Sequence, residues 1–138
     1  MAKFKIGVLR EEKSPPDKRV PLTPLICTEL LRQYPNLDIV IQPSKIRCYS
    51  DDEYLGFGLT LQEDLSDCDV LMGVKEVPKE NLIPGKKYFF FSHTIKKQAH
   101  NVKLMKTLIE KKIQMIDYET LTWKGPPTMK YLESPAAL

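Results

Sequence analysis

Short apolar runs alternate with helical segments along most of this chain, and this alternation is the strongest constraint on its fold. Apolar runs of four to seven residues, some of them uninterrupted by polar residues, are typical of strands that are covered on both faces. The sequence predicts five strands, at residues 3–9, 37–42, 69–75, 88–92 and 113–118.

Helix start and stop signals occur in the gaps between these runs. Thr23 as N-cap and Pro24 in the first turn predict a helix that ends near Tyr34. Ser50 and Glu53 have the spacing of a capping box for a short helix that ends at Gly56 or Gly58. Residues 98–112 form an amphipathic pattern whose apolar face comprises Leu104, Met105, Leu108 and Ile109.

Strands that alternate with helices predict an α/β fold: three layers, with a mostly parallel sheet and helices on both faces. The length of 138 residues is that of one domain. We expect this Rossmann-like or flavodoxin-like domain to span residues 1–122, and the Pro-rich residues 123–138 to form an irregular tail. Neither G-x-G-x-x-G nor G-x-x-x-x-G-K-[ST] occurs, so the domain lacks the dinucleotide fingerprint.

Composition excludes several other classes of protein. A net charge of +3, from 21 basic and 18 acidic residues, is too small for a nucleic-acid footprint. No apolar run is long enough to span a membrane, and the first residues do not resemble a secretory signal. The three cysteines are far apart and indicate neither disulfides nor a metal site. We therefore expect a cytoplasmic protein, or a mitochondrial matrix protein if a transit peptide is missing.

Four polar residues follow strands of the predicted sheet. Lys75 ends one apolar run and His93 comes just after another, while Arg19 follows the first strand and Glu119 the last. Ligands of open α/β sheets bind beyond the carboxyl ends of the strands, so all four residues are candidates for one site.

Each candidate also has an ordinary structural explanation. Burial disfavours a charged ammonium, so Lys75 could exchange protons near neutral pH, but a lysine at a strand end can equally emerge into solvent. His93 could cap the next helix rather than take part in catalysis. Arg19 could bind a carboxylate with two hydrogen bonds, although an isolated loop arginine is more often a surface charge.

Three segments together resemble a known family. "KIGVLREEKSPPDKRVPLTP", "GVKEVPKENLIPGKKYFFFSHTIKKQ" and "MIDYETL" are similar to the N-terminal domain of the alanine dehydrogenase and transhydrogenase group. The likeness extends over residues 3–121, and is strongest to the saccharopine dehydrogenase branch and to lysine–ketoglutarate reductase.

The resemblance implies a domain that binds an amino acid or 2-oxo acid, joined to a separate domain that holds NAD or NADP. It implies that Lys75 and His93 transfer protons, that Arg19 binds the substrate carboxylate, and that Glu119 lies at the same site. In the family the chain would continue into the cofactor domain, whereas this sequence ends in "WKGPPTMKYLESPAAL".

Several functions stay open at this point. The chain could be part of a dehydrogenase acting on saccharopine and lysine, or of an enzyme that oxidatively deaminates alanine. It could also be a stand-alone amino-acid-binding or regulatory module, or a domain that serves only in interactions. An apolar helix face could serve a homo-oligomer as well as a core.

Overall fold

The computed structural model describes residues 3–12, 15–91 and 99–118, with side chains from Lys103 onward in the last helix. In chain order its elements are β1 (Phe4–Val8), α1 (Pro24–Gln33), β2 (Leu37–Ile41), α2 (Asp51–Gly56), β3 (Thr60–Leu61), β4 (Val70–Lys75), the 3₁₀-helix η1 (Lys79–Asn81), β5 (Lys87–Phe91), α3 (Ala99–Glu110) and β6 (Gln114–Asp117). Among these helices none is long and apolar enough to cross a membrane.

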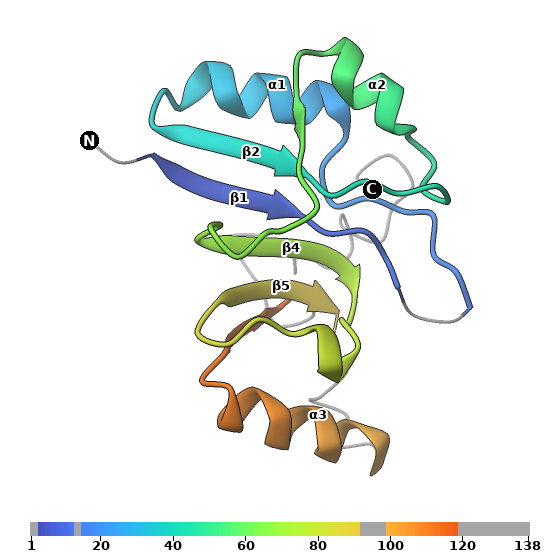
Figure 1. The fold of residues 1–138 in the computed structure, drawn as a ribbon, viewed down its shortest axis with the longest axis vertical. Helices are drawn as coiled ribbons and strands as arrows, with labels where there is room; N and C mark the ends of the chain where they lie inside the picture. The colour runs from blue at the N-terminus through green and yellow to red at the C-terminus, as the bar shows by residue number, and fades with distance from the viewer. Residues whose placement is uncertain (1–2, 13–14, 92–98, 119–138) are drawn as a thin grey trace, which may run out of the picture.

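The strands form one six-stranded sheet in the order β3-β2-β1-β4-β5-β6, and every pair is parallel (Figure 1). The chain therefore builds outward from β1 to β3, then crosses back to place β4 on the other side of β1. A parallel sheet with this order confirms the predicted α/β class.

Helices cover both faces of the sheet, as predicted. Helices α1 and α2 pack against β1 and β2 through a cluster that includes Val8, Cys27, Ile39 and Tyr54. On the opposite face, α3 packs against β4 and β5. The core residues on that face include Leu71, Tyr88, Phe90, Leu104 and Leu108. In Figure 1, α1 and α2 lie beside β2, and α3 lies at the other end of the molecule.

The predicted helix caps are confirmed. The Thr23 hydroxyl accepts a hydrogen bond from the backbone N–H of Ile26, with Pro24 in the first turn. Ser50 and Glu53 form the reciprocal capping box of α2. That helix ends at Gly56, and Gly58 adopts a φ of 82°, a conformation that favours glycine.

The predicted apolar face of α3 is only partly buried. Leu104 and Leu108 lie in the core, but Met105 and Ile109 are 43% and 73% exposed. Residues i and i+4 stack on one face of a helix, and the next position is turned about 100° away from it. The helix therefore contacts the sheet through a stripe narrower than the sequence pattern predicted.

Gly7 lets side chains of the core pack directly against the backbone of β1, next to β4. A Cβ atom placed on Gly7 would lie 2.8 Å from Cδ2 of Leu71 and 2.9 Å from Sγ of Cys68. Side chains of the core thus occupy the space that any other residue would fill. The absence of a side chain at Gly7 therefore allows dense packing of the core against β1 and the start of β4.

Candidate functional site

The carboxyl ends of β1 and β4 meet at the point where the strand order reverses. From β1 the chain proceeds to β2 on one side, while β4 pairs with β1 on the other. In open α/β sheets such a switch point leaves a crevice between connections that diverge to either side. The connections after β1 and after β4 supply the polar residues here.

Asp17, in the connection after β1, brings two of the predicted site residues together. Its side chain is only 6% exposed. Oδ2 accepts a hydrogen bond of 2.8 Å from Nη2 of Arg19 and lies 3.7 Å from Nζ of Lys75. The Arg19 guanidinium holds the pKa of the Asp17 carboxyl below its usual range. Arg19 and Lys75 therefore both interact with one buried carboxylate.

Both cations stay accessible from outside. The side chains of Arg19 and Lys75 are 46% and 34% exposed. Their common partner Asp17 was not among the residues predicted from the sequence. The other two predicted site residues, His93 and Glu119, lie outside the described residues, and their roles stay predictions.

Glu11, three residues beyond β1, is a second carboxylate that the sequence did not single out. Its oxygens accept hydrogen bonds from the backbone N–H groups of Val74, at 3.1 Å, and Lys75, at 2.6 Å. Burial raises the pKa of Glu11 to about 7, although these two hydrogen bonds lower it. The Glu11 carboxyl, hydrogen-bonded to the backbone of Lys75, thus changes charge near neutral pH.

This raised pKa predicts a pH dependence of stability. An ordinary glutamate has a pKa of 4.5, so between that pH and about 7 the folded chain binds more protons at Glu11 than the unfolded chain. Stability is therefore expected to fall as the pH rises through this range, by at most about 3 kcal/mol. Urea unfolding of wild type and E11Q at pH 5, 6, 7 and 8 measures this contribution.

E11Q should lack that decline, because an amide does not titrate. E110Q, at the exposed end of α3, is the matched control and should keep the wild-type slope. Equal slopes in wild type and E11Q would show that Glu11 titrates like an exposed carboxylate.

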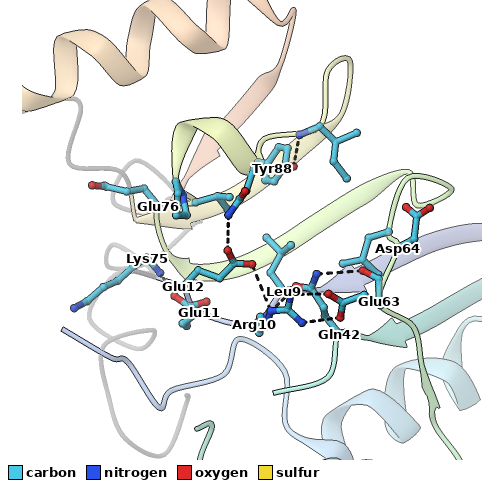
Figure 2. A pocket seen from close by; sticks show the side chains of 15 residues that line it. Leu9, Arg10, Glu11, Glu12, Gln42, Glu63, Asp64, Lys75, Glu76 and Tyr88 are labelled. Atoms are coloured by element: carbon cyan, nitrogen blue, oxygen red, sulfur yellow. Dashed lines mark hydrogen bonds and ion pairs between the residues drawn. The ribbon is translucent and has the colours of Figure 1, made fainter. Parts of the chain in front are cut away.

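A cavity of about 270 Å³ lies beside this cluster at the same edge of the sheet. Figure 2 shows Lys75 and Glu76 on one side of it, and Arg10, Gln42 and Glu63 on the other. Leu9, Val77, Ile83 and Tyr88 supply apolar contacts. A cavity that combines apolar walls with convergent polar groups is the form that small-molecule sites take.

The far side of the cavity is held by paired charges. Nη1 and Nη2 of Arg10 each donate a hydrogen bond of 2.6 Å to the Glu63 carboxylate. The side chain of Gln42 accepts from the Arg10 backbone N–H at 3.1 Å and donates to the Glu63 carbonyl at 3.2 Å. These contacts tie the connection after β1 to the ends of β2 and β3, and so fix the shape of the cavity.

The described residues after β1 lack the glycines of a dinucleotide-binding turn. The turn that would cradle a pyrophosphate contains Glu11 and Glu12 in place of glycines, and both carboxylates are engaged by groups of the protein. In the described residues, no group of three or more His, Cys, Asp or Glu side chains could hold a metal ion.

Comparisons with known proteins agree with this fold. The family described as "Alanine dehydrogenase/PNT, N-terminal domain" matches residues 7–138. The mitochondrial alpha-aminoadipic semialdehyde synthase of Bos taurus is 39% identical over 118 residues, which are 84% of this chain and 12% of that protein. Saccharopine dehydrogenase [NAD(+), L-lysine-forming] of Yarrowia lipolytica is 30% identical over 96 residues, 66% of this chain and 26% of that protein.

A solved structure shares the architecture. An L-alanine dehydrogenase superposes with a TM-score of 0.69 at 20% identity, over 87% of this chain and 34% of that chain. This chain thus spans a minor part of the length of each relative. The match over residues 7–138 and the 39% identity to the bovine protein show that the chain belongs to the alanine dehydrogenase/PNT N-terminal domain family.

Proposed function

We propose that this chain is the substrate-binding domain of an amino-acid oxidoreductase that acts on a CH–NH bond, of the saccharopine and lysine type, with NAD or NADP. The observation that carries the proposal is the meeting of Arg19 and Lys75 around Asp17 at the switch point of the sheet. The names of the bovine and yeast relatives support this reaction class.

The charges of the site suit the carboxylate of an amino acid or 2-oxo acid. Two accessible cations stand beside the buried Asp17 carboxylate, so a substrate carboxylate at the rim could pair with Arg19 and Lys75. Arg19 offers the planar donor geometry that carboxylates favour, and Asp17 fixes the orientation of its guanidinium through Nε and Nη2. A bound substrate would thus be oriented before any chemistry takes place.

In this proposal Lys75 transfers protons next to that carboxylate. Forming or hydrolysing an imine between an amine and a 2-oxo acid requires groups that give and take protons near neutral pH. Lys75 supplies a primary amine at the cavity edge, with Asp17 3.7 Å from its ammonium and Glu11 hydrogen-bonded to its backbone N–H. The family resemblance assigns His93 to the same step and implies that Glu119 lies at the substrate site.

In this proposal the nicotinamide cofactor is held by a separate domain. The acidic turn after β1 does not fit a pyrophosphate, and the bovine relative has most of its length outside the matched region. Hydride transfer is the chemistry that the cofactor supplies. This domain would orient the substrate carbon and move the protons.

Isothermal titration calorimetry tests the binding role. The protein that carries this chain is titrated with 2-oxoglutarate, L-lysine, saccharopine and L-alanine. We expect R19M to weaken binding of the preferred ligand at least about tenfold, because a hydrogen-bonded charge pair with its carboxylate is lost. R32M, on the exposed side of α1, is the matched control and should bind like wild type.

The outcomes separate the alternatives. Preference for L-alanine would favour oxidative deamination of alanine over saccharopine chemistry. Binding without lysine-dependent oxidation of NADH or NADPH in the presence of 2-oxoglutarate would favour a regulatory module. No binding of any of the four compounds would contradict the proposal.

A further inference from the structure

The end of β4 contains one more residue than the strand beside it. Met72 pairs with Phe89 and Lys75 with Phe91, so three steps along β4 correspond to two along β5. Paired residues of neighbouring strands present their side chains on the same face of a sheet. By this pairing Lys75 falls in register with Phe91, although in a regular strand a residue three positions beyond Met72 would be turned to the opposite face. The bulge decides on which face Lys75 lies.

On its other side, β4 has lost its neighbouring strand at this point. The last pair between β1 and β4 joins Val8 to Met72, after which β1 ends. In a regular strand, successive N–H groups point to opposite edges, but here both Val74 and Lys75 donate to the Glu11 carboxylate. A carboxylate offers two oxygens side by side, which matches two adjacent donors. Glu11 replaces the missing strand with a side chain.

The approach of Glu11 to the strand depends on Gly73. A Cβ atom on Gly73 would lie 3.2 Å from Oε2 of Glu11 and 3.5 Å from Cδ1 of Leu9. An alanine at this position would push the carboxylate away from the Val74 amide while leaving its chemistry unchanged. The bulge, the glycine and the glutamate thus form one arrangement around the Lys75 backbone.

We propose that Glu11 is a positioning residue that holds the bulged end of β4 so that Lys75 faces Asp17 and Arg19, a role that rests on the function proposed above for Lys75. Without the two acceptor oxygens, the strand end can relax toward regular pairing, and a change of one residue in register turns a side chain to the opposite face. The Lys75 ammonium would then leave the substrate carboxylate and the Asp17 partner.

Amide hydrogen exchange tests this placement independently of any activity. In the protein that carries this chain, E11A and G73A are expected to speed exchange of the Val74 and Lys75 amides at least about tenfold, while the Leu71 amide, deeper in β4, stays protected. E110A is the matched control on α3. Wild-type exchange of the Val74 and Lys75 amides in E11A would overturn the proposal, whatever the enzyme does.

A double-mutant cycle tests whether Glu11 acts through Lys75. We expect E11A to lower kcat/KM about 10²-fold, and E11Q, which keeps one acceptor oxygen, to lower it less. In a K75A background, E11A should cause no further loss, whereas a purely structural role would add its effect to that of K75A. Wild-type turnover of E11A together with impaired K75A would refute the positioning role and leave the proposed function standing. Unimpaired turnover of K75A would refute the proton-transfer role proposed for Lys75, and the exchange rates would still decide the placement.

Discussion

Replacing Lys75 by alanine is expected to lower kcat of the protein that carries this chain about 10²- to 10⁴-fold, the range lost with a general acid or base. The Lys75 ammonium lies 3.7 Å from Asp17 at the carboxyl end of a central strand. The methyl group that replaces this side chain in K75A can neither donate nor accept a proton. The measurement is steady-state oxidation of NADH or NADPH with L-lysine and 2-oxoglutarate, over pH 6 to 10.

The pattern of the loss distinguishes chemistry from simple binding. If Lys75 transfers protons, kcat falls and the pH profile loses one limb, while KM for the oxo acid changes little. If Lys75 only attracts the carboxylate, KM rises with kcat unchanged. K106A removes an exposed lysine of α3 and should leave both constants at their wild-type values. Wild-type kcat in K75A would contradict a role in proton transfer.

Local signals in the sequence were sufficient for the α-helices and most strands, but not for the 3₁₀-helix η1. The caps at Thr23 and Ser50 act within three residues of the helix start, so one stretch of sequence contains both donor and acceptor. In contrast, β3 is two residues long, and it pairs with β2 at one edge of the described sheet. Such a strand exists because of tertiary contact and has no pattern of its own to detect.

The candidate site was only partly predictable, because its residues interact over long distances in sequence. Arg19 and Lys75 could be proposed from their places after strands, but Glu11 contacts an amide 64 residues away and Asp17 contacts Lys75 across 58 residues. Period-two alternation would even place Lys75 on the wrong face of the sheet, because the bulge in β4 leaves no mark in the sequence.

A second large effect is expected at Arg47, which the sequence "SKIRCY" presents as an ordinary loop residue. Its side chain is 3% exposed and donates to the carbonyls of Tyr49 and Gln42, both at 2.8 Å, and to the Asp51 carboxylate. The guanidinium carbon also lies 4.7 Å from the centre of the Tyr54 ring. R47M keeps most of the volume and removes every donor.

We expect R47M to lower the free energy of unfolding by about 3 kcal/mol, at the lower end of the cost of breaking a buried ion pair, because Asp51 is 31% exposed and can be rehydrated. Chemical unfolding in urea measures the change. R32M is the matched control: Arg32 is 72% exposed and pairs with Glu29 of its own helix, so the change should be within about 0.5 kcal/mol. A loss below about 1 kcal/mol in R47M would mean that water replaces these contacts.

R47M is also expected to weaken ligand binding at the candidate site, because Arg47 is linked to that site through Gln42. The carbonyl of Gln42 accepts from Arg47, while its side chain accepts from the Arg10 backbone N–H and so holds one side of the cavity. In R47M that carbonyl loses its buried donor at the end of β2, where the chain turns away from the sheet. Ligand binding by R47M should therefore be weaker than in wild type even without urea, where the protein is fully folded. Unchanged binding in the folded variant would show that Arg47 supports the loop alone and that the Arg10–Glu63 pair suffices to shape the cavity.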